Sequence, residues 1–443
     1  MKAVLARLAY GWLLRLLLPV LYARLWWRGL REPLYRAAWG ERLGLYAGRV
    51  PGPAGRIWIH AVSLGETRAA RTLVDALRRQ RPGVSLLLTH GTATGREAGR
   101  ALLQPGDAQL WLPFDTPGSV RRFLRQQRPA VGVLMETEIW PSLLLAARKA
   151  GVPMVLANAR LSEKSQAKGR RVRALLQPAL AALTCTLAQT EADAARLRES
   201  GVAPVEVAGN LKFDLEPDAA LLERGRQWRQ ALARPVVLMA SSREGEEAPL
   251  LAAWAALPAP RPLLLLVPRH PQRFDEVAAL AQAALPRVLR RSAFVDAPPP
   301  EAAAADVWIG DSIGEMPLYY ALADVALLGG SYAPLGGQNL IEAAACGCPV
   351  LMGPHTFNFA AAADDAIAAG AARRVADLPA AVALAVELVS TASGLAERAA
   401  MAANALSFSR AHRGAAERMA SAILALPGTA REAAASGSSS TPD

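Results

Sequence analysis

Short apolar runs that alternate with helical stretches constrain the fold of this chain more than any other feature. Strands that read as continuous apolar runs and alternate with helices are typical of parallel sheets covered on both faces. One series of runs is "RIWIHAV", "VSLLLTH", "AQLWLP", "AVGVLME", "PMVLAN", "TCTLAQT" and "VEVAGN"; a second is "PVVLMAS", "PLLLLVP", "DVWIGD", "DVALLGG" and "PVLMGP". The sequence therefore predicts an α/β protein with two doubly wound domains that face a cleft.

A charged stretch, "LEPDAALLERGRQWRQALARP", separates the two series. A chain of 443 residues also exceeds what one hydrophobic core usually serves. We expect a linker at residues 216–234, between an N-terminal domain at 31–215 and a C-terminal domain at 235–427. The last residues, 428–443, have the composition of a disordered tail.

Residues 1–30 predict an amphipathic membrane-anchoring helix. No small-residue cleavage site follows the apolar part, which disfavours a signal peptide. Arg15, Pro19 and Arg24 interrupt the stretch of about 20 apolar residues that a spanning helix needs. On a helical wheel the arginines share one side and the apolar residues the other; they are Arg7, Arg15, Arg24 and Arg28 against Leu5, Leu8, Trp12, Leu16, Val20, Trp26 and Trp27. We expect the helix to lie in the plane of an anionic membrane; the alternative is packing on the protein's own body or on a partner.

A formal net charge of +12 indicates anionic partners, such as nucleic acid, an acidic membrane surface or phosphorylated substrates. The arginines are scattered, without a basic strand face interleaved with aromatic residues, so no nucleic-acid partner is expected. Lysine is rare in this chain, which makes Lys212 informative. Three cysteines are too few for a disulfide framework or a zinc set and fit a reducing compartment.

Polar and charged residues follow the predicted strands repeatedly. Ligands of open parallel sheets bind at the carboxyl ends of the strands. The groups are Ser63 to Glu66, Glu136 to Trp140, Asn158 to Ser162, Asn210 to Asp214, Ser241 to Glu247, Arg269-His270, Asp311 to Glu315, Gly329 to Glu342 and Gly353 to His355. So many groups in order are hard to assign to solvation alone. Ser63 and Glu66 also fit a helix capping box, so capping and catalysis stay open for Glu66.

The segment "GGSYAPLGGQNLIEAAACGCPVLMGP" is typical of a nucleotide site. Its glycines let backbone approach a ligand, a helix N-terminus favours phosphate, and Glu342 can accept bonds from ribose hydroxyls. The chain lacks G-x-G-x-x-G, G-x-x-x-x-G-K-[ST] and a His/Asp metal cluster, which disfavours dehydrogenases and P-loop enzymes. We therefore expect a nucleotide-sugar transferase with two Rossmann-like domains, no metal and no separate cofactor.

Eight motifs in order resemble the 3-deoxy-D-manno-octulosonic acid (Kdo) transferase family: "HAVSLGE", "METEIWP", "NARLSEKS", "GNLKFD", "SSREGEE", "VPRHPQRF", "GDSIGEM" and "GGQNLIEAAACGCPVLMGPHTFNF". The resemblance reaches from the N-terminal helix to about Ala425. It implies a GT-B glycosyltransferase that moves Kdo from CMP-Kdo to the tetraacylated disaccharide bisphosphate precursor of lipid A (lipid IVA). The implied setting is lipopolysaccharide biosynthesis at the cytoplasmic face of the inner membrane, with the membrane surface as a further partner.

The resemblance also implies roles for single residues. Glu66 corresponds to the general base, Glu136 to a supporting carboxylate and Lys212 to a transition-state stabiliser. The corresponding CMP-binding positions are Ser242, Arg243, Arg269, His270, Ile313, Gly314, Glu315, Asn339, Leu340, Ile341 and Glu342. Gln338 stands where the family more often has histidine, which removes a titratable group from that position.

The chemistry of the reaction agrees with these roles. A hydroxyl that attacks an anomeric carbon needs a nearby base, and a carboxylate serves when its pKa is raised. CMP-Kdo carries one phosphate, which cationic side chains and helix N-termini can stabilise without a metal. One base without a covalent nucleophile favours a single inverting displacement. Glu136 and Glu138 remain rivals of Glu66, and a GT-B enzyme using a UDP-sugar, or an epimerase, remains the alternative function.

Overall fold

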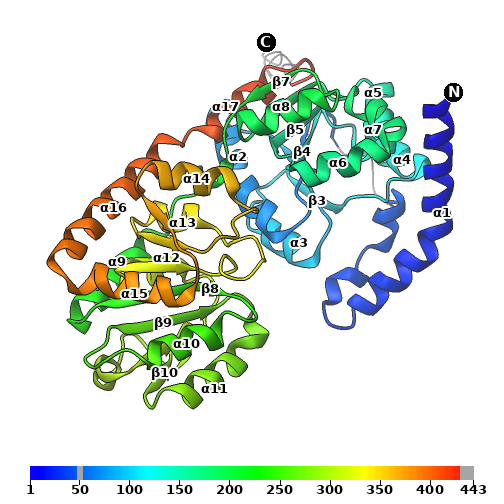
Figure 1. Cartoon of the computed structure of the whole chain (residues 1–443). Helices are drawn as coiled ribbons and strands as arrows, with labels where there is room; N and C mark the ends of the chain where they lie inside the picture. The colour runs from blue at the N-terminus through cyan, green and yellow to red at the C-terminus, as the bar shows by residue number, and fades with distance from the viewer. Residues whose placement is uncertain (47–52, 430–443) are drawn as a thin grey trace, which may run out of the picture. The chain divides into compact units, whose positions relative to one another are not determined.

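A computed structural model describes residues 1–46 and 53–429, and the chain divides into two compact units (Figure 1). The first unit comprises Met1–Asp214 and Arg413–Asp443, and the second comprises Leu215–His412. From residue 430 on, the predicted disordered tail lies outside the described residues.

The described part of the first unit is built on a parallel sheet with strand order β3-β2-β1-β4-β5-β6-β7. The strands are β1 (Ile57–His60), β2 (Leu86–His90), β3 (Ala108–Trp111), β4 (Val131–Met135), β5 (Met154–Ala159), β6 (Cys185–Ala188) and β7 (Val205–Val207). The helices are α1 (Lys2–Arg28), α2 (Leu64–Gln80), α3 (Ala93–Arg100), α4 (Pro117–Gln127), α5 (Pro141–Lys149), α6 (Glu163–Arg171), α7 (Arg173–Leu180), α8 (Glu191–Glu199) and α17 (Ala415–Leu424). Short 3-10 turns are η1 (Pro33–Arg36), η2 (Trp39–Leu43) and η3 (Leu211–Asp214).

The second unit has a parallel sheet with strand order β10-β11-β9-β8-β12-β13-β14. The strands are β8 (Val236–Ser242), β9 (Leu263–Pro268), β10 (Val288–Arg290), β11 (Val307–Ile309), β12 (Val325–Leu328), β13 (Val350–Met352) and β14 (Ala372–Arg374). The helices are α9 (Ala219–Leu232), α10 (Glu247–Ala255), α11 (Phe274–Ala284), α12 (Met316–Leu322), α13 (Leu340–Ala345), α14 (Ala360–Ala368), α15 (Leu378–Ser390) and α16 (Ala392–Ala411). Turns η4 (Pro271–Arg273), η5 (Arg291–Ala293) and η6 (Pro300–Ala304) complete it.

The two parallel sheets confirm the predicted α/β class. Each central strand is buried on both faces, as its apolar sequence requires. The edge strands β10 and β14 lack such a signal: every residue of β10 is partly exposed, and both arginines of "ARR" in β14 are exposed, which edge positions tolerate. Helix starts follow local rules, with a Ser, Thr or Asp side chain capping the first turn: Ser63, Thr92, Thr116, Ser162, Thr190, Asp218, Asp377 and Thr391.

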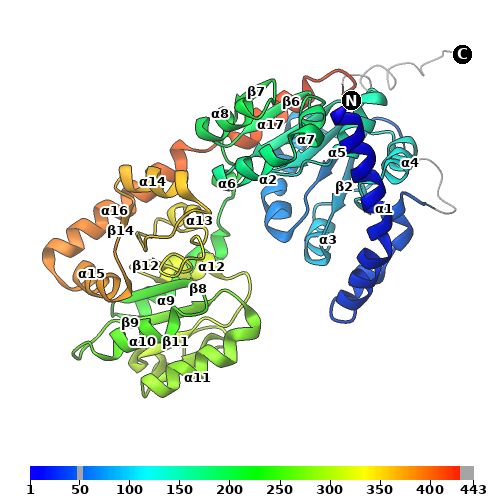
Figure 2. The same cartoon turned by 45° about the vertical axis from the view of Figure 1, so that its right-hand side comes forward.

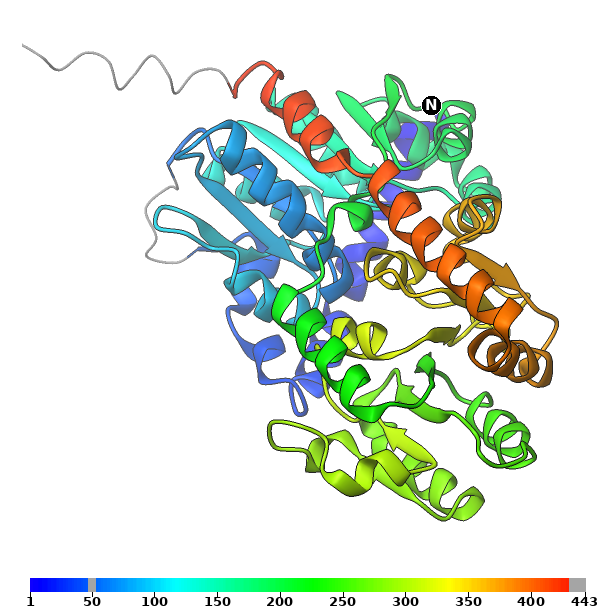
Figure 3. The ribbon, with the colours of Figure 1, turned by 90° about the vertical axis from the view of Figure 1, so that its left-hand side faces the viewer.

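Two segments belong elsewhere than the sequence predicts. Residues 216–234, expected as a linker, contain helix α9, which packs against α12 inside the second unit. Helix α17, expected in the domain at 235–427, packs against α2 of the first unit (Figure 3). The apolar face of α17 is buried in the core that α2 and the sheet share, through Ala415, Ala416, Met419, Ala420 and Ile423. Amphipathic pattern alone does not say which core a terminal helix will cover.

Helix α1 packs on the first unit with one side only. It contacts α5 and α7 (Figure 2), and Gly11 is buried beside Pro117. The Tyr10 hydroxyl donates to Asp115 Oδ2 at 3.0 Å, and Tyr22 donates to the Trp39 carbonyl at 3.1 Å. Burial raises the pKa of Asp115 to about 6. The packing alternative therefore holds for this side of the helix, whereas the other side is exposed.

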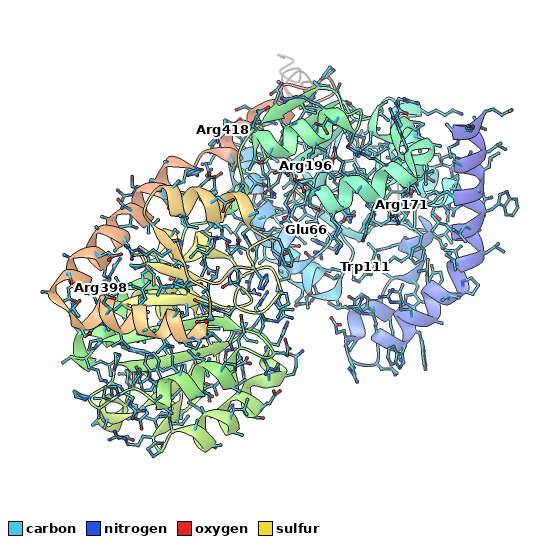
Figure 4. The ribbon with its side chains drawn as sticks, viewed as in Figure 1. Glu66, Trp111, Arg171, Arg196, Arg398 and Arg418 are labelled. Atoms are coloured by element: carbon cyan, nitrogen blue, oxygen red, sulfur yellow. The ribbon has the colours of Figure 1, made fainter. Side chains whose placement is uncertain are left out.

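Asp214, at the end of η3, binds the start of α17, which lies 200 residues later in the sequence. Its carboxylate accepts from the N–H groups of Gly414 and Ala416, both at 2.6 Å, so it caps the helix from a distant loop. Arg418, which Figure 4 labels, donates from its Nε to the Ala208 carbonyl at 3.0 Å.

We expect Asp214→Ala to destabilise the docking of α17 by about 1 to 2 kcal/mol, the usual effect of removing a helix cap. Hydrogen exchange of the amides of residues 415–424 should become faster. Asp218→Ala is the matched control, because Asp218 caps α9 in the other unit and should leave these amides unchanged. Equal exchange of α17 in the parent and in Asp214→Ala would show that the cap does not hold this helix.

Candidate active site

Loops at the carboxyl ends of three strands bring Glu66, Glu136 and Lys212 into one cluster. Glu66 lies in the first turn of α2 after β1, Glu136 directly follows β4, and Lys212 lies in η3 after β7. Lys212 Nζ is 3.9 Å from Glu136 Oε1, and both groups influence the ionisation of Glu66. The structure thus collects in one place three residues that are up to 146 positions apart in the sequence.

Ser63 and Glu66 cap the start of α2 as the sequence predicts, although the carboxylate reaches the N–H of Val62 and not that of Ser63. Glu66 Oε2 accepts from the Val62 N–H at 2.8 Å, and its Oε1 accepts from the Ser63 hydroxyl at 3.1 Å. Burial raises the pKa of the Glu66 carboxyl and the charge of Glu136 raises it further, against the opposing effects of these bonds and of Lys212. The residue is therefore both a cap and a carboxylate with increased basicity, and the two roles are compatible.

Glu138 is the second titrating carboxyl of the cluster. Burial raises its pKa to about 7, and the negative charge of Glu66 acts in the same direction.

Glu136, two residues earlier, has a left-handed backbone with φ of 58°. Strained backbone of this kind concentrates at functional sites.

Asn158 shapes the same cluster from the end of β5. It is fully buried, its φ is 53°, and its Oδ1 accepts from the Leu211 N–H at 3.1 Å. Asn210 in turn accepts from the Lys212 N–H at 3.0 Å. The sequence marks both asparagines only as polar strand ends. Their role in positioning the Lys212 loop depends on contacts that the pattern does not show.

The candidate nucleotide-binding residues all belong to the second unit. Ser242 ends β8 and donates to Glu247 Oε1 at 2.8 Å, while Arg243 follows it. Arg269 and His270 follow β9, and the pKa of His270 is lowered by burial and by the positive charge of Arg243. These residues make a positively charged end of the β8 and β9 strands, which suits an anion.

Glu246 is a residue that the sequence offered without a role. Its buried carboxylate accepts from the N–H groups of Gly330 at 2.7 Å, Arg243 at 2.9 Å and Tyr332 at 3.1 Å. It therefore holds the glycine-rich loop against the end of β8. The acidic run in "SSREGEE" was the available signal, but only the fold shows that Glu246 and Glu247 are both buried and that Glu246 is the one that holds the loop.

The other predicted CMP-binding residues differ in how far their side chains are available to a ligand. Ile313 is 73% exposed, Gly314 has a φ of 87°, and Glu315 Oε1 pairs with Arg291 Nη2 at 2.9 Å. Leu340 and Ile341 have fully buried side chains, so only their main chain can contact a ligand.

Asn339 and Glu342 lie at the start of α13. Asn339 is the N-cap of this helix, and Glu342 is half-buried in its first turn. Among residues 1–46 and 53–429, no group of three or more His, Cys, Asp or Glu side chains could hold a metal ion.

We expect Glu138→Gln to stabilise the folded chain at pH 8 and to have little effect near pH 5. A carboxyl whose folded pKa is raised contributes stability at low pH, which is lost as pH rises through about 7. The gain at pH 8 should be roughly 1 to 3 kcal/mol. Melting temperatures of parent and variant across this pH range measure the gain in stability. Glu223→Gln is the control, because Glu223 is an exposed residue of α9. A difference that does not change with pH would contradict the raised pKa.

Comparison with known proteins places the chain in a family. The family model described as "3-Deoxy-D-manno-octulosonic-acid transferase (kdotransferase)" matches residues 37–215. A 3-deoxy-D-manno-octulosonic acid transferase of Bordetella pertussis is 49% identical over 429 residues, covering 94% of this chain and 98% of the relative. The protein of the same name from Haemophilus influenzae is 36% identical over 361 residues, covering 80% and 83%.

The fold has counterparts among solved structures. A glycosyltransferase from Rickettsia africae superposes with a TM-score of 0.56 at 12% identity, covering 84% of this chain and 99% of its own. Such a likeness bears on the fold alone and confirms the predicted GT-B architecture. On the strength of its relatives, the chain belongs to the 3-deoxy-D-manno-octulosonic acid (Kdo) transferase family of glycosyltransferases.

Proposed function

We propose that this enzyme transfers Kdo from CMP-Kdo to lipid IVA, with inversion at the anomeric carbon, as a step of lipopolysaccharide biosynthesis. The identity of 49% with a Kdo transferase across 94% of the chain is the observation that carries the proposal. The cluster of Glu66, Glu136 and Lys212 supports it, because it supplies a base and a cation in one site.

Glu66 is the proposed general base. The acceptor hydroxyl oxygen attacks the anomeric carbon of Kdo, its proton passes to the Glu66 carboxylate, and the bond to the CMP phosphate oxygen breaks. The raised pKa of Glu66 favours this proton transfer at neutral pH. The Val62 N–H holds the carboxylate in place, and Lys212 offsets the charge that Glu136 adds to the site.

The second unit is the proposed CMP-binding unit. Arg243 and Arg269 offer positive charge, and His270 offers a ring N–H, to the departing phosphate. Glu342 is the proposed partner of the ribose hydroxyls. The loop held by Glu246 gives the nucleotide a fixed main-chain surface, and preorganised donors of this kind need no rearrangement during the reaction.

We expect Glu66→Gln to lower the turnover of Kdo transfer by roughly 10² to 10⁴, the usual contribution of a general base. Glutamine retains an oxygen that can accept from the Val62 N–H, so the cap should be preserved and the melting temperature should not fall. Mass spectrometry of the product made from CMP-Kdo and lipid IVA measures turnover. Transfer within a factor of about ten of the parent would instead favour Glu136 or Glu138 as base.

Helix α1 is the proposed attachment to the cytoplasmic face of the inner membrane. It is long and apolar enough to cross a membrane by composition, and little of it is buried. Its outer side exposes large apolar side chains, which an aqueous protein surface rarely gathers in one patch; they are Val4, Leu5, Leu8, Trp12, Leu13, Leu16, Leu17, Val20, Trp26 and Trp27. Tryptophans and arginines on such a helix suit the membrane interface.

We expect the triple variant Trp12→Ser, Leu16→Ser and Val20→Ser to lose binding to vesicles that contain anionic phospholipid. These side chains are 60%, 73% and 62% exposed, so the side of α1 that packs on the unit stays intact. Sedimentation with the vesicles measures binding. The control replaces exposed apolar residues elsewhere, Val207, Val295 and Leu395, by serine. Equal sedimentation of the triple variant and the parent would exclude the exposed side of α1 as the anchor.

A further inference from the structure

A cavity of about 320 Å³ lies inside the first unit, beneath α6 and α7. Its size is at the lower end of small-molecule pockets, which usually span about 300 to 1,000 Å³. Most of the surface of its wall is apolar, although polar side chains outnumber aliphatic ones in the lining. The aliphatic side chains are Ile139, Leu156, Leu161, Leu176, Leu180, Leu197 and Val202. A wall of this composition suits a hydrocarbon chain better than a sugar or a nucleotide.

Arginines contribute to the same cavity. Arg160, Arg170 and Arg173 come from the end of β5, from α6 and from the start of α7. Among the described residues, no carboxylate forms a salt bridge with the exposed side chains of Arg170 or Arg173. Exposed guanidinium groups at an apolar cavity suit a ligand that joins a phosphate to a hydrocarbon chain.

The acids of the cavity are already engaged. Glu136 is paired with Lys212, and Glu199 accepts from the Gln166 side chain at 3.0 Å. Three arginines against two glutamates, one of them paired with Lys212, give the wall a net positive charge. An anionic ligand is favoured over a cationic or neutral one.

The cavity lies between the catalytic cluster and helix α1, the proposed membrane-facing helix. Glu136 lines it, and the same residue belongs to the cluster with Glu66 and Lys212, so the cavity adjoins the proposed reacting centre. Helix α7, which supplies Leu176 and Leu180, contacts α1, the proposed membrane-facing helix. A ligand that leaves the membrane beside α1 thus meets the cavity close to the catalytic cluster.

Helix α6 covers the cavity with little packing of its own. None of its residues is buried, and Figure 4 marks Arg171 at its end. Gln166 holds it through bonds to the Arg196 carbonyl and to Glu199. A helix without buried side chains opens at low cost, which would admit a chain to the apolar space below.

We propose that this cavity binds one acyl chain of the glycolipid acceptor, while Arg160, Arg170 and Arg173 bind a phosphate group of the same molecule. The assignment rests on the proposed Kdo transfer and names where that reaction recognises its lipid. The size of the cavity limits the assignment to a single chain, so the other chains of a tetraacylated lipid lie outside it.

Leu176→Trp tests the cavity by filling it, with Ala174→Trp as control, because Ala174 is exposed on α7 and does not line the cavity. The KM for lipid IVA should rise at least about tenfold in Leu176→Trp, the loss expected when about two methylene groups can no longer be buried. The KM for CMP-Kdo should stay unchanged. Equal KM values for lipid IVA in the two tryptophan variants would overturn the proposal.

The arginines need a separate test. Replacing them does not disturb the packing of the core, because Arg170 and Arg173 are exposed. Arg170→Ala combined with Arg173→Ala should raise the KM for lipid IVA, and added salt should weaken acceptor binding less in this variant than in the parent. Arg171→Ala is the matched control: it is exposed, adjacent in sequence and outside the cavity wall. An effect of Arg171→Ala as large as that of the pair would reduce the claim to general surface charge and overturn it.

Photolabelling distinguishes failure of this proposal from failure of the proposed function. A lipid IVA analogue with a diazirine on one acyl chain should label residues of α6 and α7 in the full-length parent, and Leu176→Trp should reduce that label. The label does not depend on turnover, so it stands even if no Kdo is transferred. Labelling confined to α1, or equal competition by an anionic phospholipid of the membrane, would overturn the assignment to the acceptor.

Discussion

Carboxylates that accept hydrogen bonds from main-chain N–H groups hold the loops of both units in place. Glu66 binds the turn after β1, and Glu246 binds the glycine-rich loop after β12. Asp115 accepts from Ser142 and Leu143 at the start of α5, and Asp214 caps α17. A buried N–H without a partner is costly, so each carboxylate fixes the course of a loop that would otherwise have to solvate its backbone. Parallel strands end at one edge of the sheet, which is why these loops meet.

The same arrangement sets the chemistry of the first unit. Glu66, Glu136 and Glu138 converge, and burial together with mutual repulsion raises the pKa of Glu66 and Glu138. Only one cation of the cluster, Lys212, lies within 4 Å of these acids among the described residues. Excess negative charge in a partly buried site favours proton uptake, the property that a general base needs. The charges that destabilise the folded chain thus support the proposed role of Glu66 as general base.

Strain appears at the same edge in both sheets. Glu136, Asn158 and Ser241 have left-handed backbones after β4, within β5 and within β8. The register shifts between β5 and β6 and between β8 and β9 coincide with the last two. These irregularities turn side chains such as Asn158 out of the regular alternation of a strand. The rest of each sheet is regular and apolar, so its packing supplies the stability that offsets the cost of these strained residues.

The sequence by itself determined the α/β class, the central strands, the cap at Ser63 and the family, because these depend on local patterns and on ordered motifs. It also marked Glu66, Glu136 and Lys212 as polar residues at strand ends, and resemblance to the family gave them their expected roles. Tertiary structure alone decided that α17 joins the first unit, that α9 is not a linker, and that β10 and β14 extend the second sheet. It also decided the burial of Glu138, the inward turn of Glu246 and the cavity beneath α6. Each of these depends on which distant residues become neighbours, and neither periodicity nor composition records that information.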